Sequence, residues 1–461
     1  MSTFLFDEFS KVSAKQWKQK IQFDLKGEDY NETLVWESNE GIKVTPFYHQ
    51  DDFEALEVPR IEKQVGICQS IFISDVETAN FLAIDAVQRG ATTIQFEAHE
   101  PFDIVALLEG LVIPAKAGIH FKLKFLSENF LSDLITHAKE HKFFLNIDLV
   151  GNLAKSGNWF YDFGRDYVIL ENILAKAPQN TYILSVDASL YQNAGANMVQ
   201  QIAYALAHGN EYLNHLNDSS LDLSGSERPI QFHFSVGSNY FFEIAKLRAF
   251  RYLWILLCEE YDLKMELAIF VTPSLRNKTL YDYNVNMLRT TTECMSAMLG
   301  GATTISNVSY DAIFHKKNEF GERISRNQLL ILQDESYLKE AAQFADGSYY
   351  IEALTKQLAE KALVLFKSIE KSGGFVKQLC DGTIQRKIEE SAIKEQAQFD
   401  NGSLVLLGTN KHPNSDDKMK DSIELYPFVK TKPRKTLIRP IIAKRLAEKL
   451  EQERLENERN N

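Results

Sequence analysis

The sequence predicts a parallel (β/α)8 barrel, and the first observation behind this prediction is a strand count. Eight short runs rich in β-branched and aromatic residues alternate with helical patterns between residues 68 and 308. Eight consecutive βα units of this size are typical of such a barrel, which has no edge strand to protect. A doubly wound sheet is the alternative. It is disfavoured because no glycine-rich G-x-G-x-x-G turn follows an early strand.

The expected elements follow in chain order. The strands are expected at Cys68–Asp75, Thr92–Ala98, Ile119–Phe125, Phe143–Leu149, Tyr182–Asp187, Gln231–Val236, Met265–Val271 and Thr303–Val308. Amphipathic helices are expected between them at Val76–Arg89, Glu128–Glu140, Ala194–Leu216, Tyr240–Tyr261 and Asn284–Leu299. The barrel domain accordingly covers residues 66–340.

An arm of residues 1–65 precedes the barrel. Its Trp17, Trp36, Phe47 and Tyr48 are spread among charged residues, and the segment is too short to form a core of its own. Such an arm needs another surface to pack against, and we expect it to make a subunit contact.

Two further segments follow the barrel. Residues 341–408 are expected to be helical, with a helix over Ile351–Lys371 closed by Gly373-Gly374. Residues 409–461 combine a polar linker with a charged helix over Ile441–Arg459. Two interpretations of that last helix stay open: a narrow apolar stripe for a partner, formed by Ile441, Ile442, Leu446 and Leu450, or a solvated helix end, which is favoured.

Composition and charge exclude several classes of protein. The 461 residues carry 51 basic and 63 acidic side chains, a net charge of −12 that disfavours nucleic-acid binding. The longest apolar run, about Leu253–Cys258, is far too short to cross a membrane. The first ten residues lack the pattern of a signal peptide, so we expect a cytoplasmic protein.

Cysteines and histidines give no metal signature. The four cysteines are far apart without a C-x-x-C pair, and free buried thiols are expected. His137 and His141 would share one helix face, but Ala138 stands where a zinc protease needs glutamate. We therefore expect no metal site.

Alternation along the strands predicts a polar barrel interior. In Thr92–Ala98 the apolar side chains face the helices, which leaves the others pointing inward. The same alternation places eight polar side chains in the lumen: Gln95, Glu97, Asn146, Asp148, Ser185, Asp187, His233 and Ser235. Two interpretations stay open. Glu97, Asp148, Asp187 and His233 converge as acid, base or metal ligands, or the ring is satisfied by its own hydrogen bonds, which is favoured.

Five longer motifs resemble the methylmalonyl-CoA mutase family. They are Asn239–Trp254, Tyr283–Gly301, Arg323–Ser336, Asp346–Thr355 and Glu370–Gly374. The resemblance implies a (β/α)8 barrel in agreement with the strand count. In this family coenzyme A threads the barrel axis, and adenosylcobalamin lies across the barrel mouth on a separate C-terminal domain.

The sequence departs from the family at three barrel ends. Ser189-Leu190 stands where the family has a Tyr-His pair, although the Gln192–Ala196 turn that follows is intact. Phe270 and Thr272 replace the His and Gln of the family's strand-seven signature, and leucine and phenylalanine cannot replace the lost hydrogen bonds. At strand eight, Thr303 and Ser306 lie in a similarly altered stretch. These six positions are interpreted as a degenerate active site, with no catalytic, cofactor-binding or metal-binding residue.

The family's cobalt-binding loop, Asp-x-His-x-x-Gly, is also missing, and the sequence ends where the family's linker would lead into a cobalamin-binding Rossmann-like domain. Together these departures imply a small, non-catalytic subunit of a heterodimer. The homologous large subunit would hold adenosylcobalamin, bind the acyl-CoA and interconvert (R)-methylmalonyl-CoA and succinyl-CoA in propionate metabolism. The alternative is an independent barrel enzyme or acyl-CoA-binding protein that uses the polar lumen.

Overall fold

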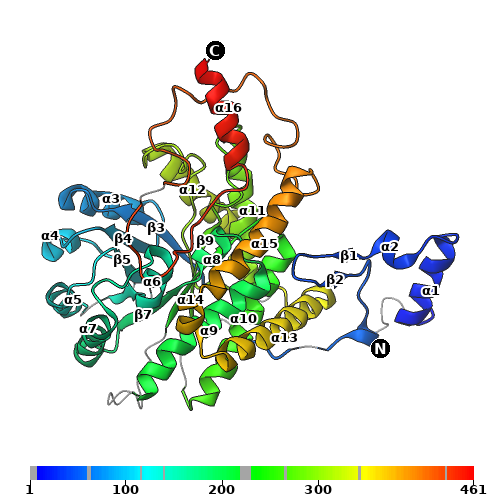
Figure 1. The fold of residues 1–461 in the computed structure, drawn as a ribbon, viewed down its shortest axis with the longest axis horizontal. Coiled ribbons are helices and arrows are strands. Elements are labelled where there is room, and N and C mark those ends of the chain that lie inside the picture. The colour runs from blue at the N-terminus through cyan, green and yellow to red at the C-terminus, as the bar shows by residue number, and fades with distance from the viewer. Residues whose placement is uncertain are drawn as a thin grey trace.

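A closed barrel of eight parallel strands forms the centre of the molecule, as the strand count predicts (Figure 1). The computed structural model describes residues 8–54, 56–59, 64–114, 117–138, 141–218, 230–263, 267–340, 344–430 and 433–460. The strands pair in sequence order, and the last closes the ring by pairing with the first. The predicted (β/α)8 fold is confirmed, and the doubly wound alternative is wrong.

The eight strands lie close to their predicted positions. They are β3 (Gly66–Phe72), β4 (Thr93–Ala98), β5 (Gly118–Leu123), β6 (Lys142–Ile147), β7 (Thr181–Asp187), β8 (Gln231–Val236), β9 (Ala268–Pro273) and β10 (Thr304–Ile305). The first strand ends before Asp75 because that carboxylate accepts the Thr78 N–H and begins the next helix. The start of the predicted strand Met265–Val271 lies outside the described residues.

Helices surround the barrel on its outer side (Figure 1). They are α3 (Val76–Gln88), α4 (Ile104–Leu108), α5 (Glu128–Thr136), α6 (Leu149–Ser156), α7 (Phe163–Lys176), α8 (Ser189–Asn193), α9 (Met198–Asp218), α10 (Tyr240–Glu260), α11 (Val285–Gly300) and α12 (Glu319–Leu330), with a π-helical turn at Ile331–Glu335. None of the helices in the described ranges has the length and apolar composition required to span a bilayer.

The apolar core lies between the strands and these helices. Ile94 and Phe96 of β4 are fully buried there, as the alternation predicts. Close helix packing requires glycine at one point: a Cβ on Gly209 of α9 would come within 2.7 Å of the Trp254 ring on α10. The four cysteines are free, but Cys380 is exposed, so the expectation of four buried thiols is wrong at that position.

Three helices extend the barrel on the side of α9 and α10, namely α13 (Tyr349–Lys371), α14 (Phe375–Cys380) and α15 (Thr383–Asp400) (Figure 1). The first of them ends as predicted, with Gly373 and Gly374 in the left-handed region at φ of 100° and 88°. Irregular chain follows and leads into α16 (Glu448–Asn460).

The last helix begins at Glu448 and not at Ile441 as predicted. Before it, the backbone is bonded to other elements: the Ile441 N–H donates to Ala154 O at 2.8 Å, and the Leu446 N–H donates to Arg276 O at 2.9 Å. Both side chains are buried in the chain's own core, while Ile442 is exposed. These side chains therefore do not form one continuous exposed stripe.

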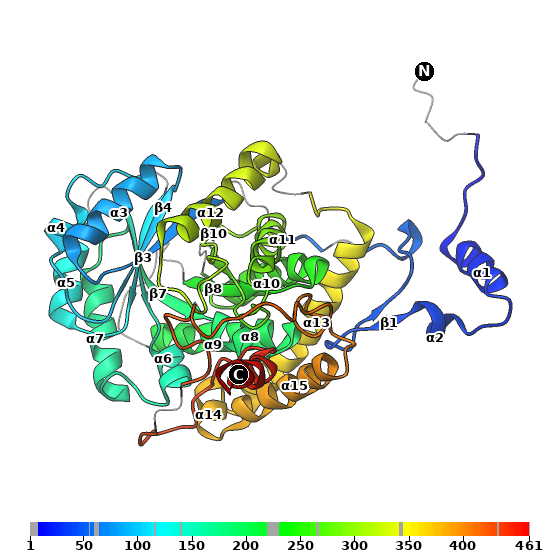
Figure 2. The same cartoon turned by 90° about the horizontal axis from the view of Figure 1, so that it is seen from above.

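The N-terminal arm consists of α1 (Ala14–Asp24), α2 (Tyr30–Leu34), a hairpin of β1 (Trp36–Glu37) and β2 (Lys43–Val44), and a 3-10 turn at Gln50–Asp52. The hairpin rests on the body, where the Trp36 ring meets Phe242 at 5.8 Å and Asn39 exchanges hydrogen bonds with Gln398. Figure 2 shows α1 and α2 projecting away from the body.

A fully buried ion pair within α10 connects that helix to the barrel through further hydrogen bonds. Lys246 Nζ lies 2.5 Å from Glu243 Oε2, and both side chains are inaccessible to solvent. Lys246 also donates to Gln192, Gln201 and the Ser235 carbonyl, while the Gly237 N–H donates to Glu243. Burial lowers the pKa of Lys246, and the charge of Glu243 opposes that effect. Removing either partner would destabilise the fold, since the remaining charge would be buried without compensation.

Replacing Lys246→Met is expected to lower the free energy of unfolding by about 3–5 kcal/mol, because it leaves the Glu243 carboxylate buried and unpaired. Urea denaturation followed by circular dichroism measures the change. The double variant Lys246→Met with Glu243→Gln should recover much of the loss. Lys20→Met, which breaks the exposed Lys20–Asp24 pair, is the control and should have an effect of less than about 1 kcal/mol. A single variant as stable as the control would contradict this account.

Candidate functional site at the barrel mouth

The carboxyl ends of β4 to β8 open into a cavity of about 680 Å³. Active sites of parallel barrels lie at this end because the strand ends and βα loops converge there. The cavity is lined by titratable side chains from several elements: Lys122, Lys124, Asp148, Lys155, Asp187, His233 and Arg434. It is the natural candidate for a functional site.

Aromatic rings fill the barrel lumen at the base of this cavity. The His120 ring stacks on Phe144 at 4.2 Å, and Phe144 stacks on Tyr182 at 4.4 Å. Phe270 enters from β9, lies 5.1 Å from the His120 ring and is almost completely buried. The rings of His120, Phe144 and Tyr182 come from adjacent strands in register, and Phe270 meets them from β9, so the four form one layer across the interior.

Asp148 is a structural acceptor at the wall of the cavity. Its Oδ1 accepts hydrogen bonds from the Gly151 N–H at 2.7 Å and the Tyr212 hydroxyl at 2.8 Å, and it lies 2.9 Å from His208 Nε2. Its Oδ2 accepts the Asp187 N–H at 2.7 Å. With four partners, this carboxylate begins α6 and holds the end of β7, as the hydrogen-bonded interpretation expects.

Asp187 and His233 are in direct contact. His233 Nδ1 lies 3.1 Å from Asp187 Oδ1, its Nε2 lies 2.9 Å from Thr272 Oγ1, and Ser189 donates to the same carboxylate. Burial raises the pKa of Asp187, but His233 and the lysines Lys122 and Lys155 outweigh burial and hold that pKa well below its usual value. Asp187 is therefore ionised at neutral pH.

Glu97 lies beside a lysine with a perturbed pKa. Lys124 Nζ is 3.5 Å from Glu97 Oε1. Burial and the like charges of Lys122 and Lys155 lower the pKa of Lys124 to about 8, while Glu97 and Asp187 act in the opposite direction. Burial raises the pKa of Glu97, but the surrounding lysines reverse this and lower it overall.

The structure thus brings only some of the four residues singled out from the sequence into contact. Asp187 and His233 touch, Asp148 reaches them through the Asp187 backbone, and Glu97 pairs with Lys124. Among the described residues, no group of three or more His, Cys, Asp or Glu side chains is placed to hold a metal ion. The four do not form one acid–base centre.

The six positions that differ from the family fall in two groups. Leu190 and Phe270 line the cavity, and Ser189 and Thr272 hydrogen-bond to its Asp187 and His233. Thr303 instead bridges β9 and β10, where its Oγ1 donates to Ile269 O at 2.9 Å and accepts the Ile269 N–H at 3.0 Å. Ser306 is buried beside it, with its N–H donating to Val271 O.

Four basic residues of the cavity were not singled out from the sequence. Lys122 and Lys124 stand two residues apart at the end of β5, a spacing that places both on one face of a strand. Lys155 and Arg434 come from α6 and from the irregular segment before α16. The β5 pair carried a signal in the sequence, whereas the approach of Arg434 depends on the tertiary fold.

The residues present do not fit cobalamin ligation. The sequence has no Asp-x-His-x-x-Gly loop, and within the described ranges the only sheet besides the barrel is the two-stranded hairpin of the arm. At the barrel mouth, Leu190 and Phe270 offer no hydrogen bond to a cofactor or a thioester.

The ε-amine of Lys124 is expected to react with an amine-modifying reagent with a titration midpoint near pH 8, since its neutral form becomes abundant there. An ordinary lysine titrates near pH 10.4. Peptide mass spectrometry after brief acetylation at a series of pH values measures this midpoint. Glu97→Gln should lower it further, because it removes a carboxylate that stabilises the charged amine. A midpoint near pH 10 for Lys124 would refute the argument.

Comparison with known proteins points to a single family. The family model for methylmalonyl-CoA mutase matches residues 138–457 of this chain. A methylmalonyl-CoA mutase small subunit from Porphyromonas gingivalis is 33% identical over 457 residues, covering 91% of this chain and 73% of that protein.

Longer relatives match only in part. A methylmalonyl-CoA mutase from Cereibacter sphaeroides is 37% identical over 234 residues, which cover 50% of this chain and 33% of that protein. The Escherichia coli methylmalonyl-CoA mutase is 32% identical over 246 residues, which cover 52% of this chain and 34% of that protein. The matches therefore span about a third of the length of these two relatives. Because the family match spans residues 138–457 and the small-subunit alignment covers 91% of this chain, the chain belongs to the methylmalonyl-CoA mutase family.

Proposed function

We propose that this chain is the small, non-catalytic subunit of a heterodimeric, adenosylcobalamin-dependent methylmalonyl-CoA mutase. A homologous large subunit would hold the cofactor, bind the acyl-CoA and interconvert (R)-methylmalonyl-CoA and succinyl-CoA in the cytoplasm. The observation that carries the proposal is the barrel interior. Aromatic rings fill the axis that coenzyme A would have to thread.

The barrel mouth supports a non-catalytic role. Leu190 is buried at the position where the family pattern has the histidine that contacts the thioester, and a leucine cannot make that hydrogen bond. Phe270 closes the lumen beneath it. A substrate held in the family's manner would have to displace several buried rings, at a cost in lost packing for each.

The arm supports the role of a subunit. Helix α1 buries none of its residues, and Phe23 on it is 79% exposed. Phe9 and Trp17 are also exposed. Figure 2 shows this part of the arm extending from the body. Large exposed aromatics on an extended segment are typical of a protein interface.

The competing function is an independent barrel enzyme, and one observation favours it. Asp187, His233 and Thr272 form a hydrogen-bonded row beside the cavity, an arrangement able to move a proton. Assaying the purified chain alone, and again after adding the large subunit, separates the two functions. We expect isomerisation only in the mixture. Turnover of methylmalonyl-CoA by the isolated chain supplied with adenosylcobalamin would rule out the non-catalytic role.

Trp17→Ser combined with Phe23→Ser is expected to weaken association with the large subunit at least about tenfold, because buried aromatic anchors dominate interface energetics. Biolayer interferometry with the immobilised large subunit measures the affinity. Phe81→Ser is the matched control, since Phe81 is 67% exposed on α3, on the opposite side of the molecule from α1 (Figure 2). Equal affinities for the double variant and the wild type would show that the arm makes no such contact.

Restoring the family pair by Ser189→Tyr with Leu190→His is expected to give no isomerase activity in the isolated chain. The filled lumen and the missing cobalt-binding loop remain, and a single restored imidazole replaces neither. The assay is succinyl-CoA formation with adenosylcobalamin present, and circular dichroism confirms that the variant is folded. Measurable succinyl-CoA would show that the chain retains a complete site.

A further inference from the structure

We propose that the cavity at the barrel mouth binds a small, multiply charged anion, a phosphate ester or a dicarboxylate, through Lys122, Lys124, Lys155 and Arg434. This inference does not depend on the proposed subunit role. It concerns the space above the aromatic layer, which stays open although the lumen below is filled.

The first argument is charge. The chain carries a net charge of −12, yet these four cations converge on one cavity. Three carboxylates lie nearby: Asp148 has four hydrogen-bond partners, Asp187 contacts His233 and Ser189, and Glu97 pairs with Lys124. In the part of the chain that the structure describes, neither Lys122 nor Lys155 forms an ion pair. The cavity therefore has an excess of positive charge that an anion would neutralise.

The second argument is how the cations are held. Lys122 stands on β5, Lys124 directly follows that strand, and Lys155 stands on the last turn of α6. The Arg434 guanidinium donates to the Ser156 carbonyl at 2.6 Å, which fixes it beside α6. The backbone of its segment is bonded to the same region, since the N–H groups of Leu437 and Ile438 both donate to Gly157 O. Three separate elements thus bring positive charge to one place.

The third argument is that the lysines repel one another. Besides burial, the charges of Lys122 and Lys155 depress the pKa of Lys124, while Glu97 is its only ion-pair partner in the described residues, at 3.5 Å. An anion bound between them would remove this repulsion. Ammonium groups hold phosphate and carboxylate through charge-assisted hydrogen bonds.

The size of the cavity favours a small molecule. Its volume of about 680 Å³ lies within the range of small-ligand sites, roughly 300–1,000 Å³. The aromatic layer closes the lumen below, so a long acyl-CoA tail cannot continue along the axis. An acidic segment of a partner protein is the competing occupant, and it predicts no affinity for free anions.

The test is isothermal titration calorimetry of the purified full chain with sodium pyrophosphate and, separately, with disodium succinate, at pH 7 and constant ionic strength. We expect saturable, single-site binding of at least one of these probes. Tighter binding of pyrophosphate would identify a phosphate ligand, and tighter binding of succinate would identify a dicarboxylate.

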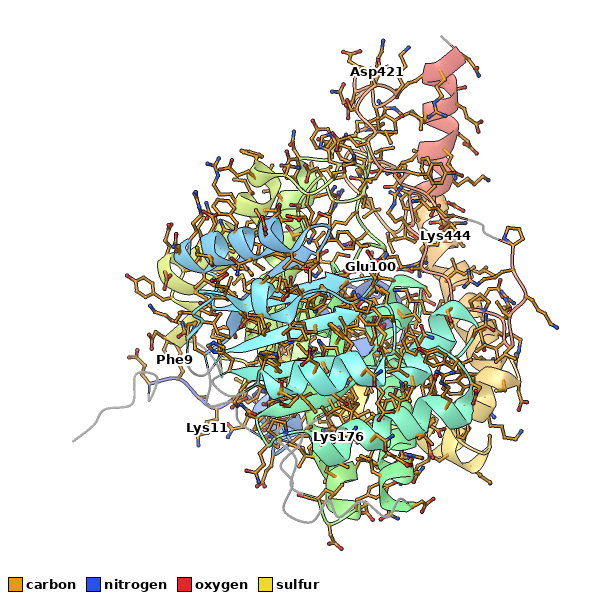
Figure 3. All side chains as sticks on the ribbon, turned by 90° about the vertical axis from the view of Figure 1, so that its left-hand side faces the viewer. Phe9, Lys11, Glu100, Lys176, Asp421 and Lys444 are labelled. Atoms are coloured by element: carbon orange, nitrogen blue, oxygen red, sulfur yellow. The ribbon has the colours of Figure 1, made fainter. Side chains whose placement is uncertain are left out.

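Variants tie the binding to the cavity. Lys124→Met and Lys155→Met keep the aliphatic stem and remove the charge. Each should lower the affinity for the bound probe roughly tenfold. Lys176→Met is the matched control and should change nothing, because Lys176 lies at the exposed end of α7, away from Glu100 at the mouth (Figure 3). Thermal melting confirms that each variant is folded.

Two results would overturn the proposal. One is the absence of saturable binding for both probes at millimolar concentrations, which would leave the acidic partner segment as the occupant. The other is equal affinity in the wild type and all three variants, which would place the binding elsewhere. Neither result bears on the mixing assay for isomerase activity, so failure of this site and failure of the subunit role are distinguishable.

Discussion

The filling of the barrel axis by stacked rings is the constraint on which the rest of this molecule depends. A closed eight-stranded barrel has room inside for side chains and little else. His120, Phe144, Tyr182 and Phe270 use that room. The same layer separates the mouth from the far end of the barrel and gives the remaining cavity a base.

The barrel could be predicted from the sequence because each strand carries its own alternation and each βα unit repeats it. The inward direction of Glu97, Asp187 and His233 followed from the same rule. What could not be predicted depends on contacts across the whole chain. The interior of β6 shows this, since Asn146 adopts φ of 50° where the pairing with β7 shifts register. The start of the last helix was missed for the same reason, because Ile441 bonds to Ala154 rather than to its own neighbours.

Some polar side chains of the barrel interior serve the structure through hydrogen bonds, and others have a shifted pKa. Asp148 resembles a catalytic carboxylate in the sequence, yet its four hydrogen bonds make it part of the framework. Lys124 was not singled out from the sequence, yet burial and its neighbours lower its pKa to about 8. Residue type and strand parity indicate which side chains enter a barrel. Only the complete set of neighbours determines which of them keep an unsatisfied charge.

The approach of Arg434 to α6 also bears on how the protein is made. Chains emerge from the ribosome with the N-terminus first, and early domains fold as units before the rest is synthesised. All eight strands precede residue 306, whereas the guanidinium that completes the mouth lies more than a hundred residues later. The barrel can thus close during translation while its mouth stays incomplete. A segment synthesised after the barrel thus finishes the cavity at the barrel mouth.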